Sequence, residues 1–314
     1  MKRESQSGLL LSRAFTPQSS SSSSALEWSH WDLSQSDARD QICRLSELDT
    51  VVAEALMAPE TRPRGTKHDG GAILILRGVN LNEGADPEDM VSVRIWASEK
   101  QIVSGQLRRV RAIEDVANRA ESPEGPHLAG SLVVGIASRL TDRMEKIIDD
   151  ATAAIEVYET FDHSSHSERD RQNLAEVRRR VTTLRRFIAP QRDALRSLAE
   201  GSYSWLSQDD RAILLETIDQ TTRYVEELDE TQQRAVIVQD EIATAIAERM
   251  NLTMFVLALV GGVFLPLSFV TGLLGINVGG IPFSDSPFGF LIVCVFLLVC
   301  AGAVYWLFKK YRLI

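Results

Sequence analysis

Two long apolar stretches dominate the hydrophobic pattern near the C-terminus. The first covers residues 251–274 and the second covers residues 288–308, and neither contains a charged side chain. A helix rises about 1.5 Å per residue, so each stretch is long enough to cross a hydrocarbon layer of about 30 Å. The pattern therefore predicts two transmembrane helices. Two buried helices of a soluble core are the less favoured alternative, because such helices are seldom free of charge on every face.

The segment between these stretches, residues 275–287, is rich in glycine and proline and predicts a short loop. A short loop turns the two spans into a hairpin, so both ends of the hairpin lie on one side of the membrane. Three basic residues lie in the tail after the second span, residues 309–314, whereas the loop contains no Lys or Arg. Positive residues favour the cytoplasmic side. The loop is therefore predicted to be external and both termini cytoplasmic.

Residues 126–250 have the three- and four-residue spacing of apolar positions that predicts long stalk helices. Residues 165–196 contain nine Arg against four acidic residues, and residues 208–250 contain eleven acidic residues against four Arg. We expect these segments to pair as an antiparallel helical hairpin with opposite charges facing. No Gly or Pro interrupts the second segment before the membrane, so one helix of about 100 Å is predicted over Gln208–Leu274.

Residues 25–125 predict a mixed α/β domain. Apolar and polar residues alternate over Met90–Trp96, and a second short strand pattern follows a turn at Gln101–Ser104. This arrangement predicts a β-hairpin with one buried face. Residues 1–24 precede the domain and include an unbroken run of serines, so they are expected to form a disordered tail without a signal peptide.

The net charge of −9 is unevenly distributed. Residues 251–314 carry +2, which leaves −11 for residues 1–250. Such an acidic soluble part argues against nucleic acid as a partner, because phosphate binding needs a basic surface, and it suits a cation better. The sequence contains no phosphate-binding loop, nucleophile–base pair or zinc-hydrolase motif. We therefore expect no enzymatic activity and no cofactor.

One face of the first membrane stretch is polar at its start and then mostly small. Steps of three and four residues place on it Asn251, Met254, Ala258, Gly261, Leu265, Ser268 and Gly272. If several copies surround an axis, this face leaves a bore for water that narrows at Met254 and Leu265. Small residues equally allow neighbouring helices to pack closely, so the pattern alone leaves both interpretations open. Pro266 is either a tolerated bend or a gate.

Gly275, Ile276 and Asn277 follow at the outer end of this stretch. The amide oxygen of Asn277 and nearby backbone carbonyls can meet a hydrated cation without the desolvation penalty of a full charge. An asparagine that ends a helix is, however, the commoner occurrence. Asp285 is the only acidic residue near the external mouth and is predicted to assist cations there.

The histidines offer one candidate metal site outside the membrane. His163 and His166 are three residues apart and could bind Zn²⁺ together on a continuous helix. Their serine-rich surroundings favour a solvated loop instead. The isolated residues His30, His68 and His127 are interpreted as structural or exposed.

Several segments together carry a resemblance to a known family: Met250–Met254, Phe264–Asn277, Val278–Pro282, Glu60–Arg64 and Phe187–Asp193. They resemble the CorA superfamily of two-span divalent-cation transporters. Magnesium-transporting members carry Gly-Met-Asn where this chain has Gly-Ile-Asn, and the loop that follows is similar to the zinc-transporting branch. The resemblance covers nearly the whole chain beyond the serine run.

This resemblance implies an α+β cytoplasmic domain, a long helical stalk and two C-terminal transmembrane helices, assembled as a homopentameric funnel in the bacterial inner membrane. It implies Zn²⁺ as the main transported substrate, with Cd²⁺, Ni²⁺ and Co²⁺ as further candidates, and leaves direction and proton coupling open. Neither span contains a titratable carboxylate or histidine, so a side-chain proton relay is not expected. The alternatives are a magnesium or cobalt channel of the same architecture and a membrane-tethered scaffold or sensor.

Overall fold

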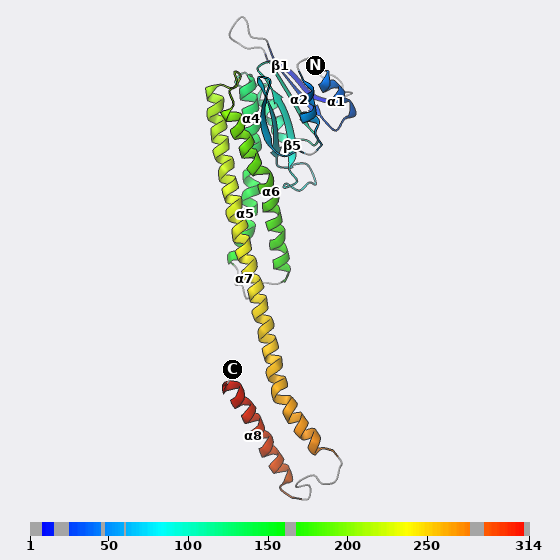
Figure 1. Cartoon of the computed structure of the whole chain (residues 1–314), viewed down its shortest axis with the longest axis vertical. Helices are drawn as coiled ribbons and strands as arrows, with labels where there is room; N and C mark the ends of the chain where they lie inside the picture. Colours follow the sequence, from blue (N-terminus) through cyan, green and yellow to red (C-terminus); the bar gives the residue numbers. More distant parts are fainter. Residues whose placement is uncertain are drawn as a thin grey trace. The chain divides into compact units, whose positions relative to one another are not determined.

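A computed structural model of the chain describes residues 8–15, 25–44, 48–59, 61–160, 168–276 and 286–310. The chain divides into an N-terminal unit, Met1–Asp240, and a C-terminal unit, Glu241–Ile314. The helices are α1 (Ser36–Cys43), α2 (Thr50–Met57), α3 (Arg111–Arg119), α4 (Ala129–Asp142), α5 (Glu145–Thr160), α6 (Glu168–Glu200), α7 (Gln208–Leu274) and α8 (Gly289–Lys310). Figure 1 colours them along the sequence, and α7 belongs to both units.

The N-terminal unit contains a six-stranded sheet of order β1-β2-β6-β5-β4-β3, in which only β2 and β6 are parallel neighbours. The strands are β1 (Leu9–Phe15), β2 (Leu26–Asp32), β3 (Arg64–His68), β4 (Gly71–Gly78), β5 (Val91–Ala97) and β6 (Gln101–Gln106). The predicted hairpin is confirmed by β5 and β6, with Trp96 opposite Val103, but the expectation of one buried face was wrong because both faces of β5 are buried. At the β3–β4 turn, Asp69 and Gly70 both have positive φ (42° and 76°), as a type I′ turn requires.

Strand β1 lies where the sequence predicted only a disordered tail, so that prediction was wrong for residues 9–15. The strand pairs antiparallel with β2 and places Phe15 opposite Leu26. Both side chains are buried in the main core. The serine run dominated the composition of the tail and obscured this apolar segment beside it. The run itself, Ser19–Ser24, lies outside the described residues.

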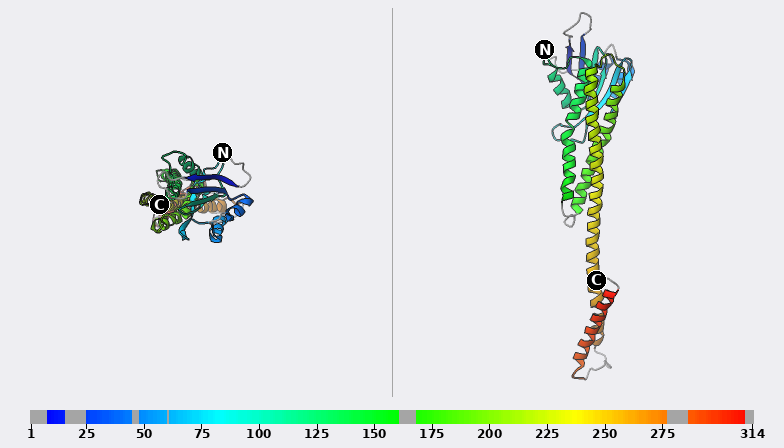
Figure 2. Two further views of the ribbon diagram at one scale, coloured as in Figure 1. Left: turned by 90° about the horizontal axis from the view of Figure 1, so that it is seen from above. Right: turned by 90° about the vertical axis from the view of Figure 1, so that its left-hand side faces the viewer.

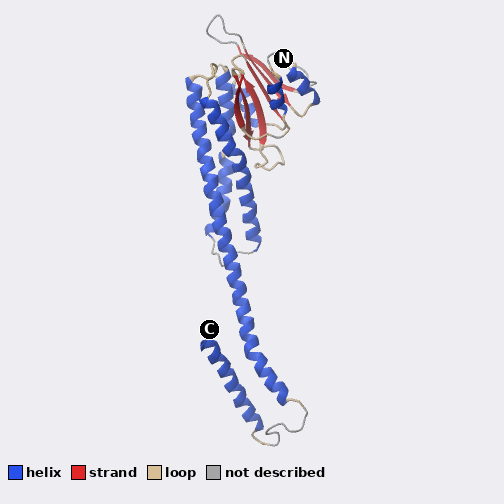
Figure 3. Cartoon of the chain, in the orientation of Figure 1, coloured by secondary structure: helices blue, strands red, loops and turns tan. Residues whose placement is uncertain are grey.

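Helices cover both faces of the sheet, as Figure 3 shows for the N-terminal unit. On one face, residues of α1 and α2 such as Ile42 and Leu56 pack against Ile73 and Trp96. On the other face, α3, α4 and parts of α6 and α7 bury the larger core, which includes Leu74 and other apolar residues of β4 and β5. The mixed α/β domain expected from the sequence is therefore a three-layer arrangement.

Helices α5, α6 and α7 share a separate apolar core, which includes Ile148, Leu184 and Leu228. The predicted pairing of the basic and acidic helices is confirmed, because Arg185 of α6 forms an ion pair with Asp229 of α7. The single helix predicted over Gln208–Leu274 is also confirmed with these bounds. The second view of Figure 2 shows the helices of the N-terminal unit side by side.

A further ion pair joins α7 to α5. Arg234 donates hydrogen bonds to both carboxylate oxygens of Glu159, at 2.8 Å from Nε and 2.5 Å from Nη2, and lies 3.7 Å from Glu156. These hydrogen bonds hold the pKa of Glu159 below its usual value. Both partners are partly exposed, so the pair is expected to stabilise the fold by only about 0.5 kcal/mol.

We expect Arg234→Gln to lower the free energy of unfolding by about 0.5 kcal/mol near pH 7. Because the folded pKa of Glu159 is below its unfolded value, this contribution is fully present above about pH 4.3 and is lost as the pH falls through the folded pKa. The measurement is the urea midpoint of the purified chain in detergent, near pH 7 and again near pH 3. Arg139→Gln, which removes a more exposed pair with Asp142, is the control. Equal losses in the two variants near pH 7 would contradict the expectation.

Candidate permeation site

The C-terminal unit is a hairpin of the last part of α7 and the whole of α8. Within the described residues, these two helices are long and apolar enough to cross a membrane, with mean hydropathies of 2.2 and 2.7 in their most apolar windows. None of either window is buried within the chain (0%). A core helix of a soluble protein would be covered by its own chain. These surfaces therefore need lipid or further copies of the chain to cover them.

Half-buried residues recur along both helices, and the two helices approach each other at Gly262 and Phe308. On α7 the half-buried residues are Phe255, Leu259, Gly261, Gly262, Val263, Leu267, Val270 and Leu274. On α8 they are Gly289, Val293, Cys294, Leu297, Cys300, Ala301, Val304 and Phe308. The approach is tight at one point, because a Cβ atom added to Gly262 would lie 2.9 Å from Cζ of Phe308. We call this contact the α7–α8 seam.

The face of α7 that the sequence singled out lies away from this seam. Its bulky members, Met254 and Leu265, are 54% and 73% exposed. A Cβ atom added to Gly261 or Gly272 would meet no atom within 4 Å. Asn251, Ala258, Ser268 and Gly272 are exposed as well, and Gly261 is half-buried. We call this surface the open face. Within one chain, it is free either to line a pore or to contact a neighbouring helix.

Gly261 and Gly262 are adjacent but belong to different surfaces, and sequence reasoning identified only the first of them. Steps of three and four residues from Asn251 reach Gly261 and pass over Gly262. This spacing is the feature of the sequence that separates the two glycines. What the pattern could not show was the partner of Gly262, since Phe308 is distant in sequence and its position depends on the loop between the spans.

The C-terminal end of the open face is a helix terminus. The backbone N–H of Gly275 donates to the carbonyls of Thr271 at 3.0 Å and Gly272 at 3.2 Å, which closes the last turn. Gly275 and Ile276 are described, whereas Asn277 and Asp285 lie outside the described residues. Further back, Pro266 lies inside the helix and, lacking an N–H, leaves the carbonyl four residues earlier without its helical donor.

The chemistry offered by this site is neutral. Among the described residues, no group of three or more His, Cys, Asp or Glu side chains could hold a metal ion. The candidate pair His163 and His166 lies outside the described residues. A cation beside the open face would meet the Asn251 amide, the Ser268 hydroxyl and backbone carbonyls. Zn²⁺ prefers nitrogen and sulfur ligands, so these oxygen dipoles suit a largely hydrated ion.

Comparison with known proteins agrees with this two-span architecture. A family model described as CorA-like Mg²⁺ transporter protein matches residues 23–310. An N-terminal α/β unit followed by a long helix and an apolar C-terminal helix thus defines a membrane transporter of divalent cations. The chain belongs to the CorA-like Mg²⁺ transporter family.

Individual relatives carry different substrate names. The chain is 38% identical over 287 residues to the divalent cation transporter CmaX of Pseudomonas aeruginosa, covering 91% of this chain and 86% of that protein. It is 35% identical over 283 residues to the zinc transport protein ZntB of Pectobacterium carotovorum subsp. carotovorum, covering 90% and 86%. The solved structure of full-length CmaX superimposes with a TM-score of 0.86 at 34% identity, covering 99% of this chain and 100% of that one. These findings confirm the family and the fold class inferred from the sequence.

Proposed function

We propose that this chain transports Zn²⁺ as its principal substrate, with Cd²⁺, Ni²⁺ and Co²⁺ as further substrates, through the axial pore of a homopentamer. The observation that carries the proposal is the neutral open face of α7, where a Cβ atom added to Gly261 or Gly272 would meet no atom within 4 Å. The preference for zinc is supported by the relative named ZntB and by Gly275-Ile276-Asn277, where magnesium-transporting members carry Gly-Met-Asn.

The proposed assembly covers the open face of each α7 with further copies of α7 and leaves an open space along the axis. One helix cannot enclose a pore, so copies of α7 surround an axis with their open faces inward, and each α8 lies behind its own α7 across the seam. The bore is then narrowest at Met254 and Leu265. Asn277 forms a ring at the outer end, and Asp285 concentrates cations at the external mouth by Coulomb attraction.

The proposed organisation along the chain keeps the sequence-derived boundaries beyond the N-terminal tail. Residues 25–125 form the cytoplasmic α/β domain, residues 126–250 form the stalk, and residues 251–274 and 288–308 cross the bacterial inner membrane. The basic residues in the last turn of α8, Lys309 and Lys310, support cytoplasmic termini. The external loop covers residues 275–287.

The neutral pathway also limits proton coupling. Between Asn251 and Phe308, Asp285 is the only titratable carboxylate, and histidine is absent from this part of the sequence. A pH gradient can therefore act only through water in the pore, through Asp285 or through groups of the cytoplasmic unit. Zn²⁺ selectivity, in turn, is set outside the open face, because that face supplies no nitrogen or sulfur donor other than the weakly donating Met254 thioether.

The test is ion flux into proteoliposomes that contain a zinc-sensitive dye, with a pH gradient of either sign and with none. We expect Zn²⁺ flux to exceed Mg²⁺ flux, and Asn277→Ala to lower it at least about tenfold while the oligomer stays intact. Asn173→Ala, at an exposed position of α6, is the matched control. Preferred Mg²⁺ or Co²⁺ flux would assign the magnesium or cobalt alternative. Intact protein without any flux would favour a scaffold or sensor.

A further inference from the structure

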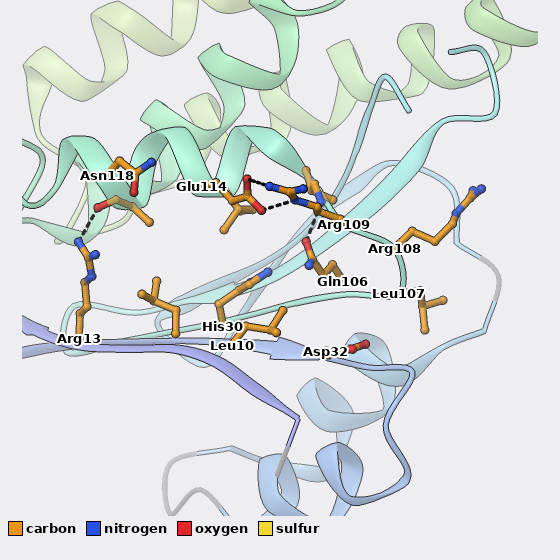
Figure 4. A pocket seen from close by; sticks show the side chains of 14 residues that line it. Leu10, Arg13, His30, Asp32, Gln106, Leu107, Arg108, Arg109, Glu114 and Asn118 are labelled. Carbon is orange, nitrogen blue, oxygen red and sulfur yellow. Dashed lines mark hydrogen bonds and ion pairs between the residues drawn. The ribbon is translucent and has the colours of Figure 1, made fainter. Parts of the chain in front are cut away.

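Charged side chains around the sheet of the N-terminal unit find their partners within the chain. A cavity of about 500 Å³ lies between β1, β2 and α3, and in its wall Arg109 donates two hydrogen bonds to Glu114, as Figure 4 shows. Arg108, in the same wall, forms an ion pair with Asp89. These charges are already compensated, so they require no group from outside the chain.

Helix α6 has a basic outer face that is not compensated in this way. Its apolar residues, such as Leu184 and Ile188, lie in the core shared with α5 and α7. Arg186 lies about opposite Ile188 around the helix, because two residues turn it by about 200°. Arg179, Arg186 and Arg196 are exposed, and within the described part of the chain none of the three forms an ion pair. We call this surface the α6 outer face.

Helix α7 has an acidic outer face over the same length. Asp219, Glu226 and Glu230 are exposed, and none of them forms an ion pair with another described residue. Ile237 follows on the same face and is 58% exposed, while Arg223 is the basic residue beside the three acids. This face is turned away from the core that α7 shares with α5 and α6. We call it the α7 outer face.

Two contacts inside the chain fix the positions of α6 and α7 along their common direction. Arg185 forms an ion pair with Asp229, and Arg178 donates a hydrogen bond to Gln239 at 2.8 Å. The two helices are therefore antiparallel, and residues whose numbers add up to about 415 lie at the same height along them.

The charges of the two outer faces match in height. Arg196 lies at the height of Asp219, and Arg186 lies about one residue from the height of Glu230. Both faces are exposed, so they do not cover each other within one chain. A rotation about an axis parallel to the helices leaves every residue at its own height. In a ring of copies around such an axis, α6 of one copy beside α7 of the next aligns both pairs.

The apolar residue of the α7 outer face also has a counterpart on α6. Ile237 lies at about the height of Arg179 by the same rule. The neighbours of Arg179 on the α6 outer face are small, namely Ala175 and Thr182. Small neighbours leave space for the Ile237 side chain, and the methylene groups of an arginine can cover an apolar surface. This match does not depend on the charges.

We propose that the outer faces of α6 and α7 are an interface between copies of this chain, in which α6 of one copy packs against α7 of the next. Each copy contributes two different faces, so the contact is heterologous, and its repetition closes a ring. The inference rests on the proposed assembly around an axis, and it does not depend on which ion is transported.

Cross-linking of the full-length chain in detergent tests this interface. The background lacks the native cysteines and carries Cys43→Ser, Cys294→Ala and Cys300→Ala. Chains with Arg186→Cys are co-expressed with chains that carry Glu230→Cys and are treated with a short bis-maleimide. We expect a cross-linked dimer from the mixture on a denaturing gel, and none from either chain expressed alone. The matched control pairs Arg186→Cys with Asp219→Cys, whose heights differ by about 15 Å, and should give no dimer.

Charge reversal gives a second measurement on the chain with its native cysteines. We expect Glu230→Arg to lower the fraction of intact oligomer in size-exclusion chromatography at least about twofold, and more at low salt. Adding Arg186→Glu to Glu230→Arg should restore the oligomer. Glu54→Arg, at an exposed position of α2 outside both faces, is the control and should leave the oligomer unchanged.

Three results would overturn the proposal. One is an intact oligomer in which the Arg186→Cys and Glu230→Cys chains do not cross-link. Another is a dimer from either chain alone, because it would show that like faces meet. The third is that the reversed pair fails to restore the oligomer that Glu230→Arg weakens. None of these measurements uses Zn²⁺ flux, so failure of the interface and failure of the proposed transport function are distinguishable.

Discussion

Replacing Gly261 with leucine is expected to lower the Zn²⁺ flux of the reconstituted protein at least about tenfold, which corresponds to about 1.4 kcal/mol in the barrier. A Cβ atom added at this position would meet no atom within 4 Å, so the hairpin leaves space for a side chain there. In the proposed pentamer, five leucine side chains would enter the bore at one level, between the narrow levels of Met254 and Leu265. The measurement is flux per oligomer in dye-loaded proteoliposomes.

The control for this variant is Val260→Leu, which adds one methylene group at the preceding position. Val260 is 48% exposed and lies off the open face. The Zn²⁺ flux of Val260→Leu is therefore expected to stay at the wild-type level. Gly261→Ala should give an intermediate flux, because a methyl group narrows the bore less. Wild-type flux in an intact Gly261→Leu oligomer would place the pore on another face of α7.

Periodicity was a reliable guide where one helix or one hairpin determined the structure. The spacing of apolar residues predicted α7 with the bounds Gln208–Leu274, because no Gly or Pro interrupts it before the membrane and the glycine that follows Leu274 favours an end there. The alternation over Met90–Trp96 likewise predicted the strand β5, although it predicted one buried face and helices cover both.

The features that the sequence could not show depend on residues distant from one another. Strand β1 is stable because Phe15 enters a core made by later segments, and the adjacent serine run concealed it. His30 was interpreted as structural or exposed, and the structure places it buried against Ser104 of β6, a partner more than 70 residues away that the sequence could not identify. The open face itself was visible in the sequence, but its role stays a prediction because it depends on further copies of the chain.

Replacing Gly262 with leucine is expected to weaken the contact between α7 and α8, which Gly261→Leu leaves unchanged. A Cβ atom at Gly262 would lie 2.9 Å from Cζ of Phe308, so a leucine side chain there has to displace the Phe308 ring. Overpacking of this kind costs about 1–3 kcal/mol. We expect a lower Tm in detergent and partial loss of the oligomer in size-exclusion chromatography.

Gly302 supplies the matched control on the other helix, because a Cβ atom there meets nothing within 4 Å, so Gly302→Leu should keep the wild-type Tm. The double variant Gly262→Leu with Phe308→Ala tests the contact directly. Removing the ring makes room for the leucine, so the double variant should be more stable than the sum of the two single effects predicts. Additive effects, or equal stability of Gly262→Leu and Gly302→Leu, would show that α8 does not lie against Gly262. The open face of α7 would then have to be assigned again, since its identification depends on α8 covering the seam.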